Sequence, residues 1–108
     1  MISHSGNWFI VALSKGRPVG LIVGYEIQRF PGDVMFLYEI DVHPDHRQKG
    51  VATQMVEFLK TECRRRKLRE MFVITNENNV AAMRLYEKTG GKRPHPDDAM
   101  FDYDLTKS

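Results

Sequence analysis

The chain has 108 residues and a formal net charge of +2, with 42% hydrophobic and 28% charged residues. This composition is typical of a folded globular protein and excludes a disordered chain, and the length predicts one domain, residues 1–108, around a single core. The small net charge argues against a nucleic-acid-binding protein, and no apolar run reaches the roughly 18 residues that cross a bilayer.

The first half of the chain predicts a meander of three antiparallel strands. Three β-favouring runs, separated by turns that contain glycine and proline, lie at residues 8–13, 19–27 and 34–42. Their connections are short, so consecutive strands are expected to be neighbours in the sheet.

The second half predicts two helices that alternate with two strands. An apolar stripe at helical spacing covers residues 50–66, and the continuous apolar run 71–75 is typical of a strand buried on both faces. Asn78 or Asn79 caps a second helix, and residues 100–105 form the last strand. A helix between two strands favours a right-handed parallel crossover, so the predicted fold class is α/β (α+β), a mixed sheet with two main helices.

The N-terminal residues and the cysteine content indicate the cellular compartment. The first residues lack the basic and apolar regions of a secretory signal. Cys63 is the single cysteine and lies within a helical pattern, so it cannot form an internal disulfide. We therefore predict a cytoplasmic protein in which Cys63 is a packing residue and not a nucleophile.

A compact basic loop, residues 47–52, joins the third strand to the first helix. The first backbone N–H groups of a helix have no intrahelical acceptor, and the helix dipole favours negative charge at that end. Gly50 lets the backbone approach a ligand closely, and the small Ala52 keeps the first turn open. The pattern predicts a pyrophosphate site; a plain helix start with a basic surface is the alternative.

Two motifs carry a resemblance to a known family. The loop motif R-x-x-G-x-A is matched by Arg47, Gly50 and Ala52, and the segment N-x-x-A-x-x-L-Y-E-K-x-G is matched by residues 79–90. With the order of the elements, they resemble the GNAT family of N-acetyltransferases over about residues 8–105. The resemblance implies an acetyl-CoA-dependent enzyme whose sheet splays at the parallel strand, where the pantetheine arm of the cofactor enters.

The resemblance also implies a set of cofactor-binding residues. Backbone N–H groups of residues 48–52 cradle the pyrophosphate, Thr53 adds a hydroxyl, and Asn79 contacts the pantetheine arm while it caps its helix. The complete implied set is Ile40, Val42, Arg47, Gln48, Lys49, Gly50, Val51, Ala52, Thr53, Asn79 and Tyr86.

Direct acetyl transfer from a thioester to an amine needs a proton donor and a proton acceptor but no enzyme nucleophile. The family match makes Tyr86 the general acid, because a phenol keeps its proton at neutral pH; spacing alone makes it a core aromatic residue. Glu39 and Asp41 are the candidate bases, and Glu39 is preferred because the family often places an acid immediately before the residue that corresponds to Ile40. No spacing of His, Cys and Asp indicates a structural metal site.

The two candidate bases lie on the third predicted strand. Glu39 and Asp41 are two residues apart, so they share one face of the sheet, and Tyr38, Ile40 and Val42 then share the other face, towards the core. Two acidic residues on one strand face predict a solvated surface or an acceptor pocket.

Within the family, residues 38–53 and the tail Phe101-Asp102 look most like the aminoglycoside 3-N-acetyltransferases. The expected acceptor is a small-molecule amine, either an aminoglycoside or another cation. Carboxylates that would attract it lie at Asp97, Asp98, Asp102 and Asp104. Two alternatives stay open: a protein N-terminus or lysine as the acceptor, and a non-catalytic acyl-CoA-binding or dimerisation module.

The first predicted strand begins near residue 8, whereas family members usually carry a strand and two helices ahead of it. The resemblance therefore implies an N-terminally short domain, either truncated or completed by a second protomer. Apolar surface that stays uncovered would favour a homodimer.

Overall fold

The computed structural model describes residues 6–95, 97 and 99–106. Its elements are β1 (Asn7–Ser14), β2 (Arg17–Ile27), β3 (Val34–Val42), η1 (Pro44–His46), α1 (Val51–Arg65), β4 (Glu70–Ile74), α2 (Val80–Lys88) and β5 (Met100–Asp104). Every strand and helix expected from the sequence is present, with bounds that shift by only a few residues. Within this described part of the chain, neither α-helix is long and apolar enough to cross a membrane.

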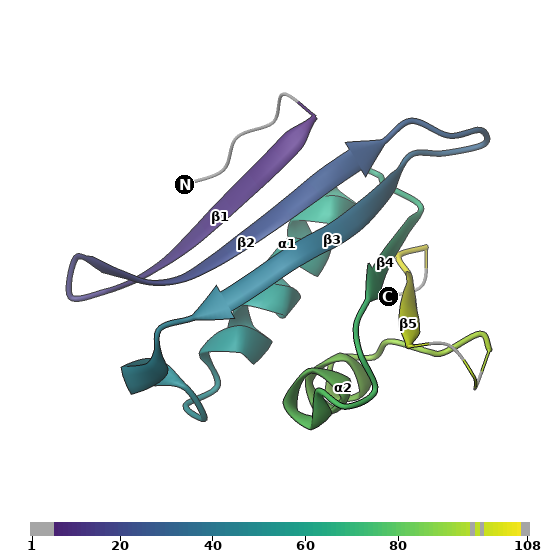
Figure 1. Ribbon diagram of the computed structural model, residues 1–108. Coiled ribbons are helices and arrows are strands. Elements are labelled where there is room, and N and C mark those ends of the chain that lie inside the picture. The colour runs from purple at the N-terminus through teal and green to yellow at the C-terminus, as the bar shows by residue number, and fades with distance from the viewer. Residues whose placement is uncertain (1–5, 96, 98, 107–108) are drawn as a thin grey trace.

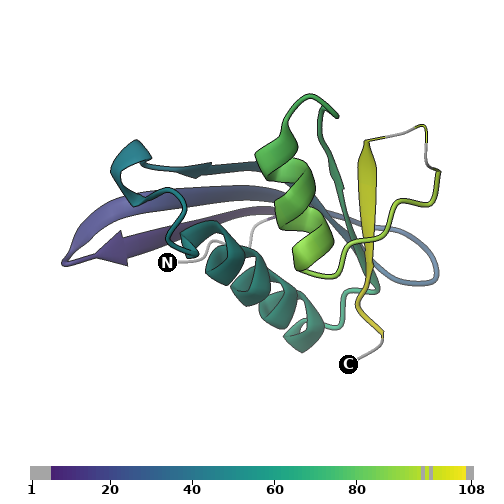
Figure 2. The ribbon, with the colours of Figure 1, turned by 90° about the horizontal axis from the view of Figure 1, so that it is seen from below.

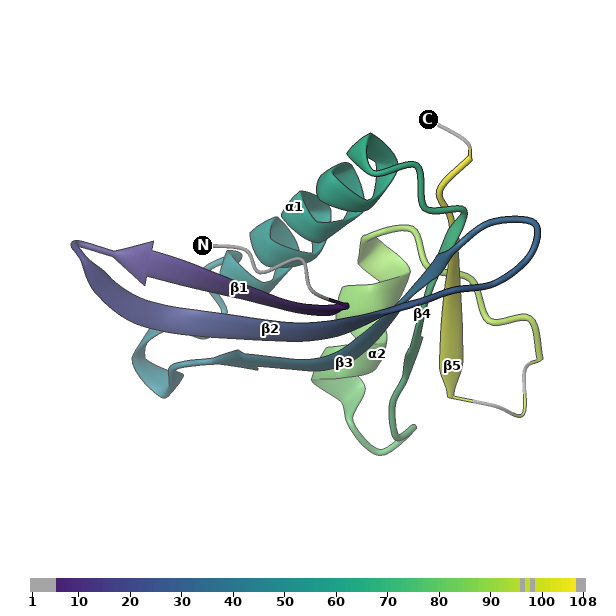
Figure 3. The same cartoon turned by 90° about the horizontal axis from the view of Figure 1, so that it is seen from above.

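The strands form one mixed sheet in the order β1-β2-β3-β4-β5 (Figure 1). The β3–β4 pair is parallel and the other pairs are antiparallel, which confirms the predicted fold class. β3 and β4 pair through residues 34–36 and 70–72, and beyond these residues the two strands diverge. Figure 3 shows the consequence, since β4 and β5 turn away from the first three strands. The predicted splay is therefore present.

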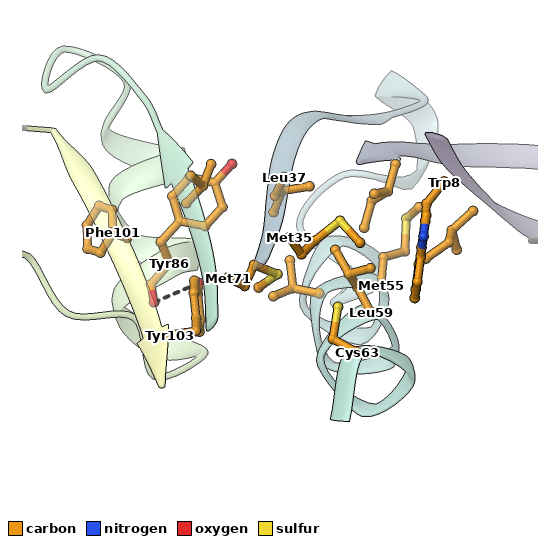
Figure 4. Close-up of a cluster of buried hydrophobic side chains, with 14 of the residues drawn as sticks. Trp8, Met35, Leu37, Met55, Leu59, Cys63, Met71, Tyr86, Phe101 and Tyr103 are labelled. Atoms are coloured by element: carbon orange, nitrogen blue, oxygen red, sulfur yellow. Dashed lines mark hydrogen bonds between the residues drawn. The ribbon is translucent and has the colours of Figure 1, made fainter. Parts of the chain in front are cut away.

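Both helices cover the same face of the sheet (Figure 2). The core beneath them contains fully buried side chains from several elements, including Trp8 of β1, Leu37 of β3, Leu59 of α1 and Met71 of β4 (Figure 4). Cys63 is fully buried in the same cluster, and this burial raises the pKa of its thiol to about 12. A protonated thiol among apolar side chains agrees with the predicted packing role.

The opposite face of the sheet, the outer face, carries no helix from the described residues. Four aromatic side chains gather on it: Tyr25, Phe36, Tyr38 and Phe72. The rings of Phe36 and Phe72 stack with their centroids 4.8 Å apart, across the last paired residues of β3 and β4. Ile74 is 61% exposed on the same face, so the prediction that residues 71–75 are buried on both faces is wrong. The helices flank β4 on one side only.

A β-bulge interrupts the alternation of side chains along β3. Val23 pairs with Glu39 but the next residue, Gly24, pairs with Leu37, which leaves Tyr38 as an extra residue. Tyr38 is 57% exposed, so the prediction that it faces the core together with later residues of the strand is wrong. The bulge shifts the inward and outward alternation of side chains by one position. It is defined by the pairing with β2, so the periodicity of the β3 sequence alone cannot reveal it.

After the bulge the alternation resumes in the predicted sense. Val42 is buried and Ile40 packs against the core, whereas Glu39 and Asp41 are exposed. The two carboxylates therefore lie on the side of β3 away from the core, as predicted.

Candidate active site

Short-range contacts shape the loop after β3. Arg47 Nε donates a hydrogen bond of 3.0 Å to the carbonyl of Val42, which ties the loop back to the end of the strand. Gln48 and Gly50 have left-handed backbone, with φ of 61° and 82°. Glycine adopts this conformation at little cost, and in this loop it delivers Gly50 as the N-cap residue of α1.

The N-terminus of α1 is free to meet an anion. The first hydrogen bond of the helix joins the Gln54 N–H to the Gly50 carbonyl at 3.0 Å, so the N–H groups of Val51, Ala52 and Thr53 have no intrahelical acceptor. The first turn contains no acidic side chain to neutralise the positive end of the helix dipole. A Cβ added at Gly50 would meet no heavy atom within 4 Å, so the space beside this backbone is open.

A cleft of about 800 Å³ opens in front of this helix end. Its walls are the end of β3, the basic loop, the first turn of α1 and one side of α2. The residues singled out from the sequence that line it are Ile40, Asp41, Val42, Arg47, Gln48, Gly50, Val51, Ala52, Thr53, Asn79 and Tyr86. The fold thus joins the two motifs, which are far apart in the sequence, around one space.

Two residues expected at the site do not line this cleft. Lys49 lies in the same loop but is exposed outside the lining, and Glu39 lies on the outer face of β3. The cleft also has lining residues that were not expected individually as site residues: His46, and Ala81, Ala82, Arg84, Leu85 and Lys88 of α2, which fall within the second motif. The α2 positions recur every three or four residues, and this helical spacing was the available signal.

The charge of the cleft is mainly positive. Arg47, Arg84 and Lys88 line it, and Asp41 is the carboxylate among the described lining residues. The Arg47 Nη2 and Asp41 Oδ1 atoms are 3.9 Å apart with both side chains largely exposed, so this ion pair is weak, and Arg84 and Lys88 leave an excess of positive charge. A cleft with this charge and a helix N-terminus suits an anionic ligand.

Asn79 is the residue that caps α2. Its Oδ1 accepts a hydrogen bond of 3.1 Å from the Ala82 N–H, which satisfies one of the free donors at the start of the helix. The sequence left Asn78 and Asn79 as alternatives, and the structure selects Asn79. Because Asn79 also lines the cleft, its side-chain amide group lies within reach of a ligand there.

Tyr86 projects from α2 between the two parts of the sheet. Its side chain is 4% exposed, and burial raises the pKa of its phenol above the ordinary value. Figure 4 shows the phenol oxygen directed towards Leu37 of β3, whereas the backbone carbonyl of Tyr86 points the other way, towards Tyr103. The phenol therefore stays protonated at neutral pH and faces the opening of the splay.

The tail carboxylates lie apart from the cleft. Asp102 and Asp104 belong to β5, and neither they nor Asp97 line the cleft; Asp98 is outside the described residues. Burial is the main cause that raises the pKa of Asp102, and the neighbouring Glu70 carboxylate acts in the same direction. Any role of Asp102 and Asp104 towards an acceptor is thus exerted from β5 and not from the cleft lining.

The fold is thus a splayed mixed α/β sheet with an open helix N-terminus beside the splay. The sequence matches the acetyltransferase (GNAT) family over residues 2–91, most of its length. The chain therefore belongs to the GNAT family of acetyltransferases.

The curated relatives that match this chain include named acetyltransferases. An acetyltransferase of Pectobacterium atrosepticum is 29% identical over 87 residues, which cover 81% of this chain and 59% of that protein. The chain thus spans about 59% of the length of this curated relative.

Two solved structures share the fold at low sequence identity. An aminoglycoside acetyltransferase from an uncultured soil metagenomic sample, in complex with trehalose, superposes with a TM-score of 0.79 at 16% identity over 86% of this chain and 62% of its own. The aminoglycoside N-acetyltransferase AAC(6′)-Iy in complex with CoA superposes with a TM-score of 0.74 at 23% identity over 85% of this chain and 72% of its own. At these identities the likeness establishes the fold.

The stability of the protein should fall at high pH because of two buried phenols and the buried thiol of Cys63. Burial raises the pKa of Tyr86 above its ordinary value and raises the pKa of Tyr103 to about 12. Tyrosines of the unfolded chain have a pKa of about 10. Above pH of about 10 the native state therefore binds more protons than the unfolded state, and the free energy of unfolding declines as the pH rises towards about 12. Urea denaturation from pH 9 to 12 measures this decline. It should be shallower for Tyr103→Phe, and an equally steep decline in that variant would contradict the assignment.

Proposed function

We propose that this protein is an N-acetyltransferase that moves an acetyl group from acetyl-CoA directly to a primary amine. The observation that carries the proposal is the cleft that joins the open N-terminus of α1 to the phenol of Tyr86. The open helix N-terminus suits the pyrophosphate of acetyl-CoA, and the Tyr86 phenol suits its thioester end. Membership of the GNAT family supports the same reading.

The residues of the cleft fit acetyl-CoA, which supplies the acyl group as a thioester. The free N–H groups at residues 51–53 and the backbone N–H group of Gln48 would face the pyrophosphate, and Thr53 would add its hydroxyl, whereas Lys49 lies outside the cleft lining. Ile40 and Val42 lie where β3 has left β4, so one edge of the β3 backbone is available to the amides of the pantetheine arm. Asn79 lines the cleft and would contact that arm from α2.

In the proposed reaction the enzyme moves two protons and forms no covalent bond to substrate. A carboxylate accepts a proton from the ammonium group through water, and the amine nitrogen bonds to the acyl carbon. The nitrogen then releases its second proton to solvent, and the carbon–sulfur bond breaks. Tyr86 Oη holds the proton that the departing thiolate needs, and its raised pKa keeps that proton in place at neutral pH. Glu39 and Asp41 remain the candidate bases: Asp41 lines the cleft, and Glu39 lies on the outer face of the same strand.

The proposed acceptor is a cationic small-molecule amine, with aminoglycosides as one candidate. The resemblance of residues 38–53 to the aminoglycoside 3-N-acetyltransferases supports this choice, as does the acidic surface formed by Glu39 and Asp41. A protein N-terminus or lysine is the second candidate acceptor, and a non-catalytic acyl-CoA-binding module is the rival from another class. That rival predicts cofactor binding without turnover.

The proposed assembly is a cytoplasmic homodimer of single-domain chains. The outer face supports it, because Phe9, Tyr38 and Ile74 are each more than a third exposed there and such apolar area is usually covered in solution. We expect sedimentation equilibrium to give twice the chain mass, and Ile74→Lys to return the protein to a monomer. A monomeric wild-type protein at micromolar concentration would remove the dimer from the proposal.

Binding of acetyl-CoA tests the cleft directly. Gly50→Glu places bulk and negative charge beside the open helix end, so we expect calorimetric titration to show tight binding by the wild-type protein and none by the variant. Gly16→Glu is the matched control, because Gly16 has a similar φ of 78° in the β1–β2 turn, away from the cleft. Loss of binding in both variants would point to backbone strain, and absence of binding by the folded wild-type protein would refute the cofactor assignment.

Steady-state kinetics with a panel of amines tests the chemistry. Because a general acid or base contributes about 100-fold or more, Tyr86→Phe should lower kcat by about that factor while acetyl-CoA still binds. The panel contains aminoglycosides, simple alkylamines and lysine peptides, and CoA release is the readout. Glu39→Gln and Asp41→Asn identify the base by which of them removes the acidic limb of the pH profile. Cofactor binding without CoA release for any acceptor would favour the non-catalytic module.

A further inference from the structure

The C-terminal end of α2 is closed by hydrogen bonds from both backbone and side-chain groups. The helix ends in a Schellman motif, in which the Gly91 N–H donates to the Tyr86 carbonyl at 2.8 Å and the Gly90 N–H donates to the Glu87 carbonyl at 3.2 Å. Gly90 has a φ of 100°, which suits this motif. A Cβ at Gly91 would lie 2.9 Å from the Tyr86 oxygen and 3.0 Å from Cζ of Tyr103, so the packing around this carbonyl is tight.

Two buried hydroxyl groups add to the Schellman bonds on the same helix end. Thr89 is 4% exposed, and its Oγ1 lies 2.9 Å from the Leu85 carbonyl oxygen and 2.7 Å from the Tyr103 hydroxyl. The Tyr103 hydroxyl donates to the Tyr86 carbonyl at 3.2 Å (Figure 4). Since burial raises the pKa of Tyr103 to about 12, this hydroxyl keeps its proton over the working range of pH. The backbone of Tyr86 is therefore tied to β5.

A lysine from α1 completes the contact. Lys60 Nζ donates a hydrogen bond of 2.6 Å to the Thr89 carbonyl, pairs with Glu57 at 2.8 Å, and lies 5.6 Å from the centroid of the Tyr103 ring. Only 12% of the Lys60 side chain is exposed. Burial removes hydration from an ammonium group, which costs free energy. The partners of Lys60 offset this cost and hold its ammonium group at the end of the helix.

We propose that Lys60, Thr89 and Tyr103 form a clamp that sets the position of the Tyr86 phenol relative to α1. The first turn of α1 and the inner side of α2 are two walls of the cleft, and the clamp is a polar link between these helices at the other end of α2. The three are positioning residues, since their contacts are to the backbone of Tyr86 and its neighbours and not to the phenol. The catalytic consequence rests on the proposed acid role of Tyr86.

The geometry of the clamp can be measured without any enzymatic activity. We would label the tyrosine ring carbons with ¹³C and assign the Tyr86 signal by its loss in Tyr86→Phe. In Tyr103→Phe, which keeps the ring but removes the hydroxyl, the Tyr86 signal should shift and its titration midpoint should move. Lys60→Met should change the same signal, whereas Lys60→Arg, which keeps the positive charge, should leave it as in the wild-type protein. An unchanged Tyr86 signal in folded Tyr103→Phe and Lys60→Met would overturn the proposal.

Tyr25→Phe is the matched control for the lost hydroxyl. It removes a phenol oxygen from the outer face, on the opposite side of the sheet from the clamp, and should leave the Tyr86 signal in place. A shift of the same size in this control would show that the signal responds to any tyrosine change, and would also overturn the clamp.

Kinetics then separates positioning from simple stabilisation. At a temperature well below unfolding, Tyr103→Phe should lower kcat by about tenfold while KM for acetyl-CoA changes by less than about twofold, because a misplaced acid weakens the chemical step and not cofactor binding. In a Tyr86→Phe background the same change should have no further effect. Wild-type kcat in Tyr86→Phe itself would refute the proposed acid, and the ring signals would still decide whether the clamp positions this side chain.

Discussion

The structure depends on the short parallel pairing of β3 with β4. The two strands share hydrogen bonds through residues 34–36 and 70–72 and then separate, with the stacked rings of Phe36 and Phe72 on the outer face at the fork. Backbone groups at the far end of β3 are therefore left without a strand partner along one edge, and buried polar backbone favours a partner of some kind. The cleft lies beside this edge, so the interruption of the sheet creates the space of the proposed site.

The walls of the cleft are held by different physical means. The N-terminus of α1 is positioned locally, since Arg47 bonds to the end of β3 and Gly50 turns the backbone into the helix. The position of α2 depends on tertiary contacts, since its C-terminal carbonyls accept hydrogen bonds from Tyr103 of β5 and Lys60 of α1. The pyrophosphate end of the proposed site is thus prepared by sequence neighbours, and its reacting end by residues far apart in the chain.

The two faces of the sheet have opposite characters. One face is sealed by both helices over a core that includes Trp8 and Leu59. The other presents aromatic rings beside the carboxylates of Glu39 and Asp41. A globular domain normally buries both faces of such a sheet or leaves one face polar, so this surface is the part of the molecule where a partner, a second copy or an acceptor has most to gain in buried area.

The sequence by itself determined the order and type of the elements, the fold class and the two motifs at the cleft, because hydrophobic periodicity, turn residues and helix caps act between near neighbours. Tertiary structure decided the rest. The bulge at Tyr38 depends on register with β2, the exposure of Ile74 depends on where both helices pack, and the lining by Arg84 and Lys88 depends on how α2 faces α1. The clamp of Lys60, Thr89 and Tyr103 joins three segments that are far apart in the sequence. No local sequence pattern predicts it, because each of these residues is common in its own type of element.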